Sequence, residues 1–162
     1  MIEVIEANIT TLKVDAIVNA ANQWLYEAGT LDIAIRRAAG PKLEKHCRNL
    51  DGCPVGEAVI TPGFKLPAKW IIHAVGPKWE GGDQNEPELL ATCYKNTLQL
   101  AVDEGIKSIA LPGISTGIYA YPKSQAVQIA IQQMQAFEKK FERIIACCFT
   151  QNDKMRYLEY LS

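Results

Sequence analysis

The stretch Trp70-Ile71-Ile72-His73-Ala74-Val75 contains a nearly continuous apolar run, interrupted by a single histidine. A run of this kind is typical of a strand that is covered on both faces of its sheet. Elsewhere in the chain, short runs rich in β-branched residues predict further strands. These strands are Ile2–Ile5, Ala16–Val18, Glu57–Thr61, Ser108–Leu111 and Arg143–Cys148.

The segments between these strands carry apolar residues one helical turn apart, as Leu90, Tyr94 and Leu98 do. Glycine and proline mark several boundaries, for example Gly40-Pro41. The predicted helices are Leu31–Ala39, Pro41–Leu50, Pro87–Glu104, Pro122–Lys139 and Asp153–Leu161. Strands that alternate with helices predict an α/β layered domain with a mixed or parallel sheet. Ligands of such sheets bind where loops follow the carboxyl ends of strands.

Composition sets the broad class of the protein. The 162 residues suit one domain, and 48% of them are hydrophobic, as in ordinary globular chains. A net charge of -1 argues against a general nucleic-acid binder. The first residues do not form a signal peptide, the longest apolar runs are too short to span a bilayer, and the five cysteines form no C-x-x-C motif. We therefore expect a cytoplasmic protein with reduced thiols, one domain over residues 1–162, and no membrane or nucleic-acid partner.

The first loop of interest begins where the strand Ala16–Val18 ends. Asn19 and Asn22 are separated by two alanines, and Asp32 lies near the start of the next helix. The amide of Asn22 both donates and accepts hydrogen bonds, so it suits sugar hydroxyls. The alternative is structural: the asparagines cap turns and Asp32 complements a helix N-terminus. Taken alone, this loop favours the structural interpretation.

The second loop, residues 112–122, contains the motif Gly113-Ile114-Ser115-Thr116-Gly117 and raises the question of a serine hydrolase. A nucleophile elbow needs a helix directly after the serine, and a histidine further along the chain. Both histidines, His46 and His73, precede this serine, so the hydrolase interpretation fails. Two interpretations remain: a backbone cradle for phosphate oxygens, or an ordinary loop that uses glycine for its backbone conformation.

Other candidate groups give weaker signals. Phe149, at the end of the last strand, either stacks on a base or belongs to the core. His73 is expected to be a core histidine, and residues 83–86 a solvated turn. His46, Cys47 and Cys53 are too few and wrongly spaced for a metal site. Neither a G-x-G-x-x-G nor a P-loop motif occurs, which leaves no support for a Rossmann dehydrogenase or a P-loop NTPase.

Several separated segments, in order and spacing, resemble the macrodomain family, and most closely its MacroD-type branch. They are residues 14–22, 37–41, 66–69, 72–77 and 114–119, so the resemblance spans most of the chain. It implies a three-layer α/β/α sandwich with a mixed central sheet and a cleft for ADP-ribose. It also implies hydrolysis of ADP-ribose esters, on mono-ADP-ribosylated acidic side chains or on O-acetyl-ADP-ribose, without a metal or other cofactor.

The resemblance also assigns roles to individual residues. Asn22 and Asp32 match the catalytic pair: Asn22 fixes a distal ribose hydroxyl, and Asp32 orients or deprotonates the attacking water, or positions it beside a phosphate. The residues that it places around the ligand are Asn8, Ile9 and Phe149 at the adenine, Asn152 near the proximal ribose, Gly29, Thr30 and Leu31 in the first loop, and Gly113, Ser115, Thr116, Gly117, Ile118 and Tyr119 in the diphosphate loop, with Tyr119 against the distal ribose.

The sequence departs from the family pattern mainly in the first loop. Glu27, Ala28 and Thr30 stand where the family has glycines, and Arg36 stands where a histidine is common. Asn8 replaces an acidic residue, and Ala120 replaces a glycine. Glycine permits close backbone approach, which these side chains restrict. Two alternatives to the enzyme therefore stay open: a non-catalytic reader of ADP-ribose, and a cleft adapted to another nucleotide or RNA.

Overall fold

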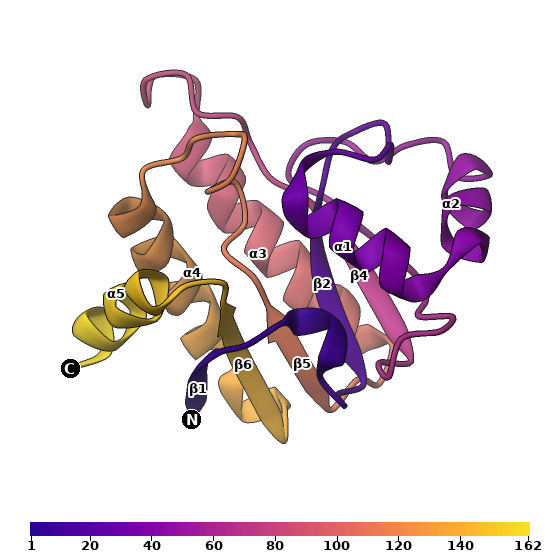
Figure 1. Ribbon diagram of the computed structural model, residues 1–162. Helices are drawn as coiled ribbons and strands as arrows, with labels where there is room; N and C mark the ends of the chain where they lie inside the picture. Colours follow the sequence, from indigo (N-terminus) through magenta and orange to yellow (C-terminus); the bar gives the residue numbers. More distant parts are fainter.

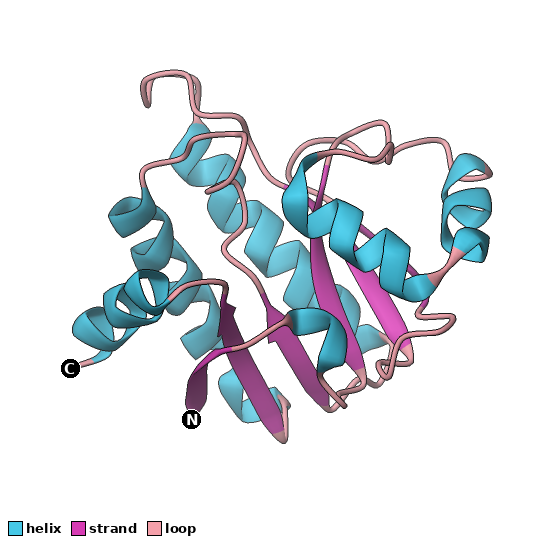
Figure 2. Ribbon diagram, viewed as in Figure 1, coloured by secondary structure: helices cyan, strands magenta, loops and turns pink.

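A computed structural model describes residues 1–162 and contains one six-stranded sheet (Figures 1 and 2). The strand order is β1-β6-β5-β2-β4-β3, and every neighbouring pair is parallel except β3 and β4, which are antiparallel. The sheet is therefore mixed, as predicted. The strands are β1 (Ile2–Glu6), β2 (Ala16–Ala21), β3 (Ala58–Pro62), β4 (Trp70–Val75), β5 (Ser108–Leu111) and β6 (Arg143–Cys148).

Helices cover both faces of this sheet. They are α1 (Gly29–Ala39), α2 (Pro41–Arg48), α3 (Glu86–Asp103), α4 (Lys123–Phe137) and α5 (Gln151–Leu161), with short 3-10 helices η1 (Ile9–Thr11) and η2 (Glu138–Lys140). Figure 1 shows α1 in front of the strands and α3 behind them. None of the helices is both long and apolar enough to cross a membrane.

Alternate residues of each strand point into two separate cores, because successive side chains leave a strand on opposite faces. Ala16 and Val18 of β2 pack in the core shared with α3, α4 and α5, whereas Ile17 packs in the core shared with α1 and α2. The same division separates Ile72 from Ile71 in β4. The predicted three-layer α/β/α sandwich is thus confirmed.

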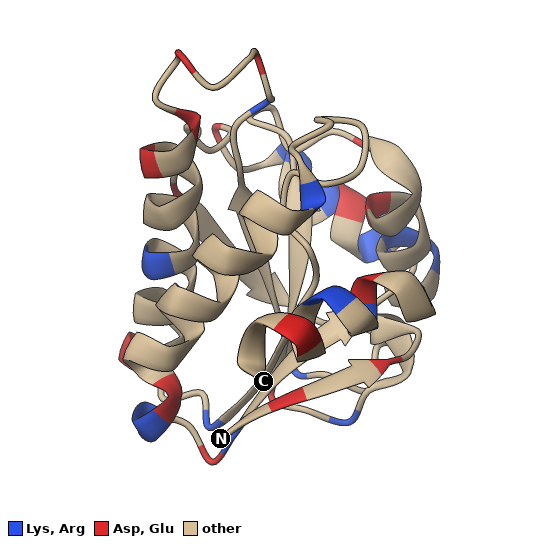
Figure 3. Ribbon diagram, turned by 90° about the vertical axis from the view of Figure 1, so that its left-hand side faces the viewer, with Lys and Arg blue, Asp and Glu red and all other residues tan.

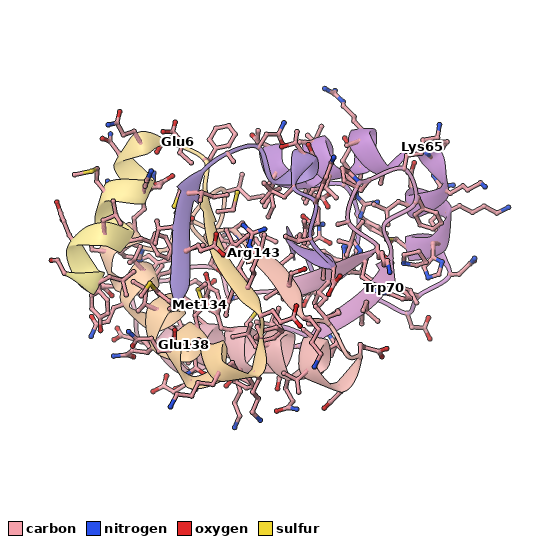
Figure 4. All side chains as sticks on the ribbon, turned by 90° about the horizontal axis from the view of Figure 1, so that it is seen from below. Glu6, Lys65, Trp70, Met134, Glu138 and Arg143 are labelled. Atoms are coloured by element: carbon pink, nitrogen blue, oxygen red, sulfur yellow. The ribbon has the colours of Figure 1, made fainter.

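The element boundaries agree with the prediction to within three residues. The largest difference is at β2, which continues to Ala21 instead of ending at Val18, because Asn19, Ala20 and Ala21 pair with β4. Strands β4, β5 and β6 begin and end where predicted. The amino-terminal ends of β4 and β6, at Trp70 and Arg143, are labelled in Figure 4.

The segment before α3 corrects one prediction. The sequence predicts a solvated turn over residues 83–86. Asp83, Gln84 and Asn85 are exposed as predicted, but Glu86 is only 1% exposed. Its carboxylate accepts hydrogen bonds from the backbone N–H groups of Glu80, Gly82 and Gln84, at 2.8, 2.8 and 2.6 Å. Burial by itself raises the pKa of Glu86, but these backbone donors outweigh it and lower the pKa to about 2. Glu86 therefore organises the turn from inside.

Charged side chains of both signs lie on α1, α2, α3 and α5, whereas Lys123 is the only charged residue of α4. Figure 3 shows acidic and basic positions following one another on α3, and the chain as a whole carries a net charge of -1. The five cysteines are free and buried, and burial raises the pKa of Cys53 to about 11 and the pKa of Cys93 and Cys148 to about 12. These thiols are therefore part of the packing of the two cores.

Candidate functional site

Loops that follow parallel neighbouring strands meet at one edge of the sheet. The loop after β2 (residues 22–28) and the loop after β5 (residues 112–122) both leave this edge, and Figure 1 shows them above the sheet. They come close together at Gly29, where an added Cβ would lie 3.9 Å from Cδ1 of Ile118. The structure thus brings the two loops singled out in the sequence side by side.

Asn22 organises the loop after β2. Its Oδ1 accepts hydrogen bonds from the backbone N–H groups of Trp24 and Tyr26, both at 3.1 Å, and its Nδ2 donates to the carbonyl of Tyr26 at 3.2 Å. Asn22 thus has the turn-capping role that the sequence favoured. One of its two amide hydrogens has no partner in the chain, so it is free to donate to a ligand.

Asp32 is almost fully buried, with 1% exposure, at the start of α1. Its Oδ1 accepts from Nδ2 of Asn19 at 2.6 Å, and its Oδ2 accepts from the backbone N–H of Ala28 at 2.8 Å and from Nε of Arg36 at 2.9 Å. Arg36 also donates through Nη2 to the carbonyl of Leu25 at 2.8 Å. Both carboxylate oxygens therefore have partners within the chain, and the hydrogen bonds to Ala28 and Leu25 tie the loop to α1.

A series of buried polar side chains continues this hydrogen-bond network from β2 to β4 and β3. Nδ2 of Asn19 also lies 3.2 Å from Nδ1 of His73, and Nε2 of His73 lies 2.9 Å from Oγ1 of Thr61. Burial, assisted by the charge of Arg36, lowers the pKa of His73 to about 3, so the ring is neutral near pH 7. Because an amide nitrogen only donates, Nδ1 accepts and Nε2 carries the proton. His73 is a core histidine, as predicted.

Sequence reasoning missed the partners of Asp32. The sequence predicts a turn-capping role for Asn19 and gives Arg36 as a departure from the family pattern, so neither is predicted as a partner of Asp32. The signal available in the sequence was the spacing of four between Asp32 and Arg36, which places opposite charges on one helix face. Their burial could not be read from that spacing.

The loop after β5 is held in shape by its own hydrogen bonds and by α3. Tyr94 Oη accepts from the backbone N–H of Ile114 at 3.1 Å, and Thr116 Oγ1 donates to the carbonyl of Gly113 at 2.8 Å. Ser115 has a φ of +68° and a buried hydroxyl without a partner. Behind it, a Cβ at Gly76 would collide with the Ser115 hydroxyl, so glycine is required there.

Two groups of backbone donors at this edge have no partner in the chain. The N–H groups of residues 115–119 make no hydrogen bond, and neither do the N–H groups of residues 29–31 in the first turn of α1. A series of free N–H groups at a helix start or in a glycine-containing loop suits the oxygens of an anion. The structure thus brings together Gly29, Thr30 and Leu31 with Ser115, Thr116, Gly117, Ile118 and Tyr119 as such donors.

The remaining predicted residues lie at the ends of β1 and β6, which are parallel neighbours. Asn8 caps η1, and its Oδ1 accepts from the backbone N–H of Thr10 at 3.1 Å and from its hydroxyl at 2.7 Å. Ile9 is buried, whereas Phe149 is 78% exposed and Asn152 is exposed on α5. The core alternative for Phe149 is therefore wrong: its ring lies on the surface beyond β6.

Glu27 lies away from the meeting point of the two loops. It is exposed and lines a depression of about 270 Å³ on the α2 side of the first loop, together with Arg36, Glu44 and Arg48. Its carboxylate therefore does not occupy the place where Gly29 approaches Ile118. No group of three or more histidine, cysteine, aspartate or glutamate side chains is placed to hold a metal ion.

Comparison with known proteins identifies the family of this fold. The family model of the Macro domain matches residues 18–130. The chain belongs to the Macro domain family. A macro domain-containing protein of Chlorobaculum tepidum is 53% identical over 165 residues, which cover 100% of this chain and 96% of that relative.

Two further macro domain relatives carry names or ligands that bear on function. A protein of Klebsiella pneumoniae named O-acetyl-ADP-ribose deacetylase is 47% identical over 167 residues, covering 99% of this chain and 95% of the relative. A variant of the Oceanobacillus iheyensis macrodomain, solved with ADPR (ADP-ribose), superposes with a TM-score of 0.94 at 38% identity, covering 99% of this chain and 91% of that chain.

Proposed function

We propose that this macro domain protein binds ADP-ribose between the start of α1 and the loop after β5, and hydrolyses ADP-ribosyl esters there. The observation that carries the proposal is the two series of free backbone N–H groups, residues 29–31 and 115–119, on segments that approach each other at Gly29 and Ile118. A diphosphate fits such donors because its oxygens accept several charge-assisted hydrogen bonds at once. The names and ligands of the relatives point to the same ligand class.

The rest of the ligand then follows the edge of the sheet. The adenine lies by Asn8, Ile9 and Phe149, with Asn152 near the proximal ribose. The exposed ring of Phe149 is available for stacking. At the other end, the free amide hydrogen of Asn22 donates to a distal ribose hydroxyl, and Tyr119 packs against that ribose. In this proposal residues 1–162 act as one macrodomain.

For the reaction, we assign the attack to a water molecule held beside the ester by the bound diphosphate, while Asn22 fixes the distal ribose. The carbonyl carbon of the ester gains the water oxygen, and the ribose oxygen leaves with a proton. Asp32 acts mainly as a positioning residue, because its two oxygens already accept three hydrogen bonds from Asn19, Ala28 and Arg36. Positioning of this kind contributes to rate without a metal or other cofactor.

The buried ion pair of Asp32 with Arg36 also favours a second candidate, the non-catalytic reader. Because this carboxylate is occupied by Asn19, Ala28 and Arg36, it supplies no general base, and in this second candidate the groove binds ADP-ribose and releases it unchanged. Esters of ADP-ribose on proteins and O-acetyl-ADP-ribose are the ligands in both cases. All five cysteines are free and buried, which suits a reducing compartment, and we include a cytoplasmic location in the proposal.

Calorimetric titration with ADP-ribose, followed by an assay of acetate release from O-acetyl-ADP-ribose, separates these cases. The enzyme predicts binding and turnover, and Asp32→Asn, which keeps the shape of the side chain, should lower turnover more than affinity. Binding without turnover by the wild type would establish the reader. Absence of heat with ADP-ribose would exclude both and direct the search to other nucleotides or RNA.

A further inference from the structure

Two large aromatic side chains project from the loop that Asn22 organises. Trp24 is 57% exposed and Tyr26 is 66% exposed, whereas Leu25 between them is buried and has a φ of +59°. The left-handed turn at Leu25 places that side chain in the core and leaves its two neighbours outside. Both exposed residues are fixed through their backbone N–H groups to Oδ1 of Asn22. Their position is therefore set by the residue assigned to the distal ribose.

These aromatic residues border a depression of about 530 Å³ between the first loop and the segment that follows α2. The same depression is lined by Arg48, Leu50 and Asp51. The two segments are joined where the backbone N–H of Cys53 donates to the carbonyl of Gln23 at 2.8 Å, and Figure 1 shows them side by side. The depression is thus a built feature of the fold, next to the proposed ribose end of the groove.

The charge at this surface favours a cation. Arg36 is paired with Asp32, and Arg48 is paired with Glu44, so both arginines have a carboxylate partner. Glu27 and Asp51 are exposed and have no ion pair or side-chain hydrogen bond. Asp51 lines the same depression as Trp24 and Tyr26, and Glu27 lines the smaller depression that Tyr26 also borders. A free carboxylate near an exposed aromatic ring matches a lysine or arginine side chain, which gains from both the charge and the aromatic face.

We propose that Trp24, Tyr26, Glu27 and Asp51 form a docking surface for the polypeptide that carries the ester, at a basic residue close to the modified side chain. The inference rests on the proposed function. An acyl group on the distal ribose lies next to Asn22, so whatever continues from it crosses the loop that holds Trp24 and Tyr26. For O-acetyl-ADP-ribose only a methyl group follows the carbonyl, whereas a modified protein continues as a chain. The surface therefore selects protein esters over the metabolite.

The test compares two substrates in the same variants. One is O-acetyl-ADP-ribose, and the other is a peptide with one ADP-ribosylated glutamate flanked by lysines. The double variant Trp24→Ala/Tyr26→Ala keeps both backbone N–H groups that bind Asn22. We expect its kcat/KM on the peptide to fall about 10-fold or more, mainly through KM, with the value on O-acetyl-ADP-ribose unchanged. Glu27→Gln/Asp51→Asn should reduce the preference for lysines over serines at the flanking positions.

Trp70→Ala is the matched control, because Trp70 is an exposed tryptophan at the amino-terminal end of β4, away from this loop (Figure 4). This variant should leave kcat/KM unchanged on both substrates. Equal losses on both substrates in the aromatic variant would assign the residues to loop structure, and unchanged turnover of the peptide would exclude docking; either result overturns the inference. If the wild type binds but turns over neither substrate, the proposed hydrolase fails separately. The affinity of the intact peptide relative to free ADP-ribose then tests docking in the same variants.

Discussion

Nε of Arg36 donates to Oδ2 of Asp32 at 2.9 Å, and the two side chains are 7% and 1% exposed. An ion pair this well shielded holds two charges that each depend on the other, because neither is solvated. It also fixes the loop geometry, since Arg36 reaches the carbonyl of Leu25 and Asp32 accepts from the N–H of Ala28. The shape of the proposed ligand groove thus depends on this pair.

Replacing Arg36 with methionine should lower the free energy of unfolding by about 3–5 kcal/mol, because Asp32 is left buried without its partner. Urea unfolding at pH 7 measures this change. Arg48→Met is the matched control: Arg48 also pairs with a carboxylate four residues away, Glu44, but on the surface, and should cost about 0.5 kcal/mol. The double variant Asp32→Asn/Arg36→Met should lose less than the sum of its single changes, and strict additivity would contradict the coupling.

His73 should make stability depend on pH. Its pKa is about 3 in the folded chain and close to 6.5 when unfolded, so between these values the unfolded state binds more protons. The contribution of neutral His73 to the free energy of unfolding is complete above pH 6.5. It is lost as pH falls toward 3, at about 1.4 kcal/mol per pH unit. His73→Gln should remove this slope, whereas His46→Gln should retain it because His73 is still present. Denaturation series at several pH values compare them, and equal slopes in the wild type and His73→Gln would refute the prediction.

Glu86 should give the free energy of unfolding a second dependence on pH, in a more acidic range. Its lowered pKa, about 2, means that its stabilising effect is present above pH 4.5 and is lost as pH falls from there toward 2. Glu86→Gln should abolish this component and speed hydrogen exchange at the amides of Glu80, Gly82 and Gln84. Glu88→Gln, an exposed change in the same first turn of α3, is the control. Unchanged exchange at all three amides would show that Glu86 does not hold the turn.

Gly76→Ala should separate ligand affinity from stability. The new methyl group would collide with the hydroxyl of Ser115 and lie 2.6 Å from Cγ2 of Ile114, which displaces the loop of free N–H groups. We expect the affinity for ADP-ribose to fall about 10-fold or more, with a stability loss of about 1–3 kcal/mol. Gly81→Ala is strained by its φ of +94° but meets nothing within 4 Å, so it should cost stability without loss of affinity. Equal affinities for ADP-ribose in the two variants, measured by calorimetry, would refute the prediction that crowding of Ser115 weakens binding.

The sequence predicted the layers well because burial on both faces leaves a direct signal. The apolar run at β4 marks both of its ends, whereas β2 was cut short because Asn19-Ala20-Ala21 contains no β-branched residue and its extension depends on pairing with β4. The two site loops were found from their position after strands. What escaped prediction depends on tertiary packing: the burial of Glu86 beneath its own loop and the pairing of Asp32 with Arg36 inside the protein. For Phe149 the sequence left stacking and core burial open, and packing decides between them.

The buried cysteines have a practical consequence for watching the groove at work. Because all five thiols are shielded and their reactivity is suppressed, maleimide dyes should react slowly with the native chain. A cysteine introduced at Tyr119, beside the expected ribose, would then be the main site of labelling, and a fluorophore there would report ligand arrival in real time. A second label at Lys69, next to Trp70 at the far end of the sheet, would report global unfolding instead. Ligand binding and unfolding can then be followed as two separate fluorescence signals from the same molecule.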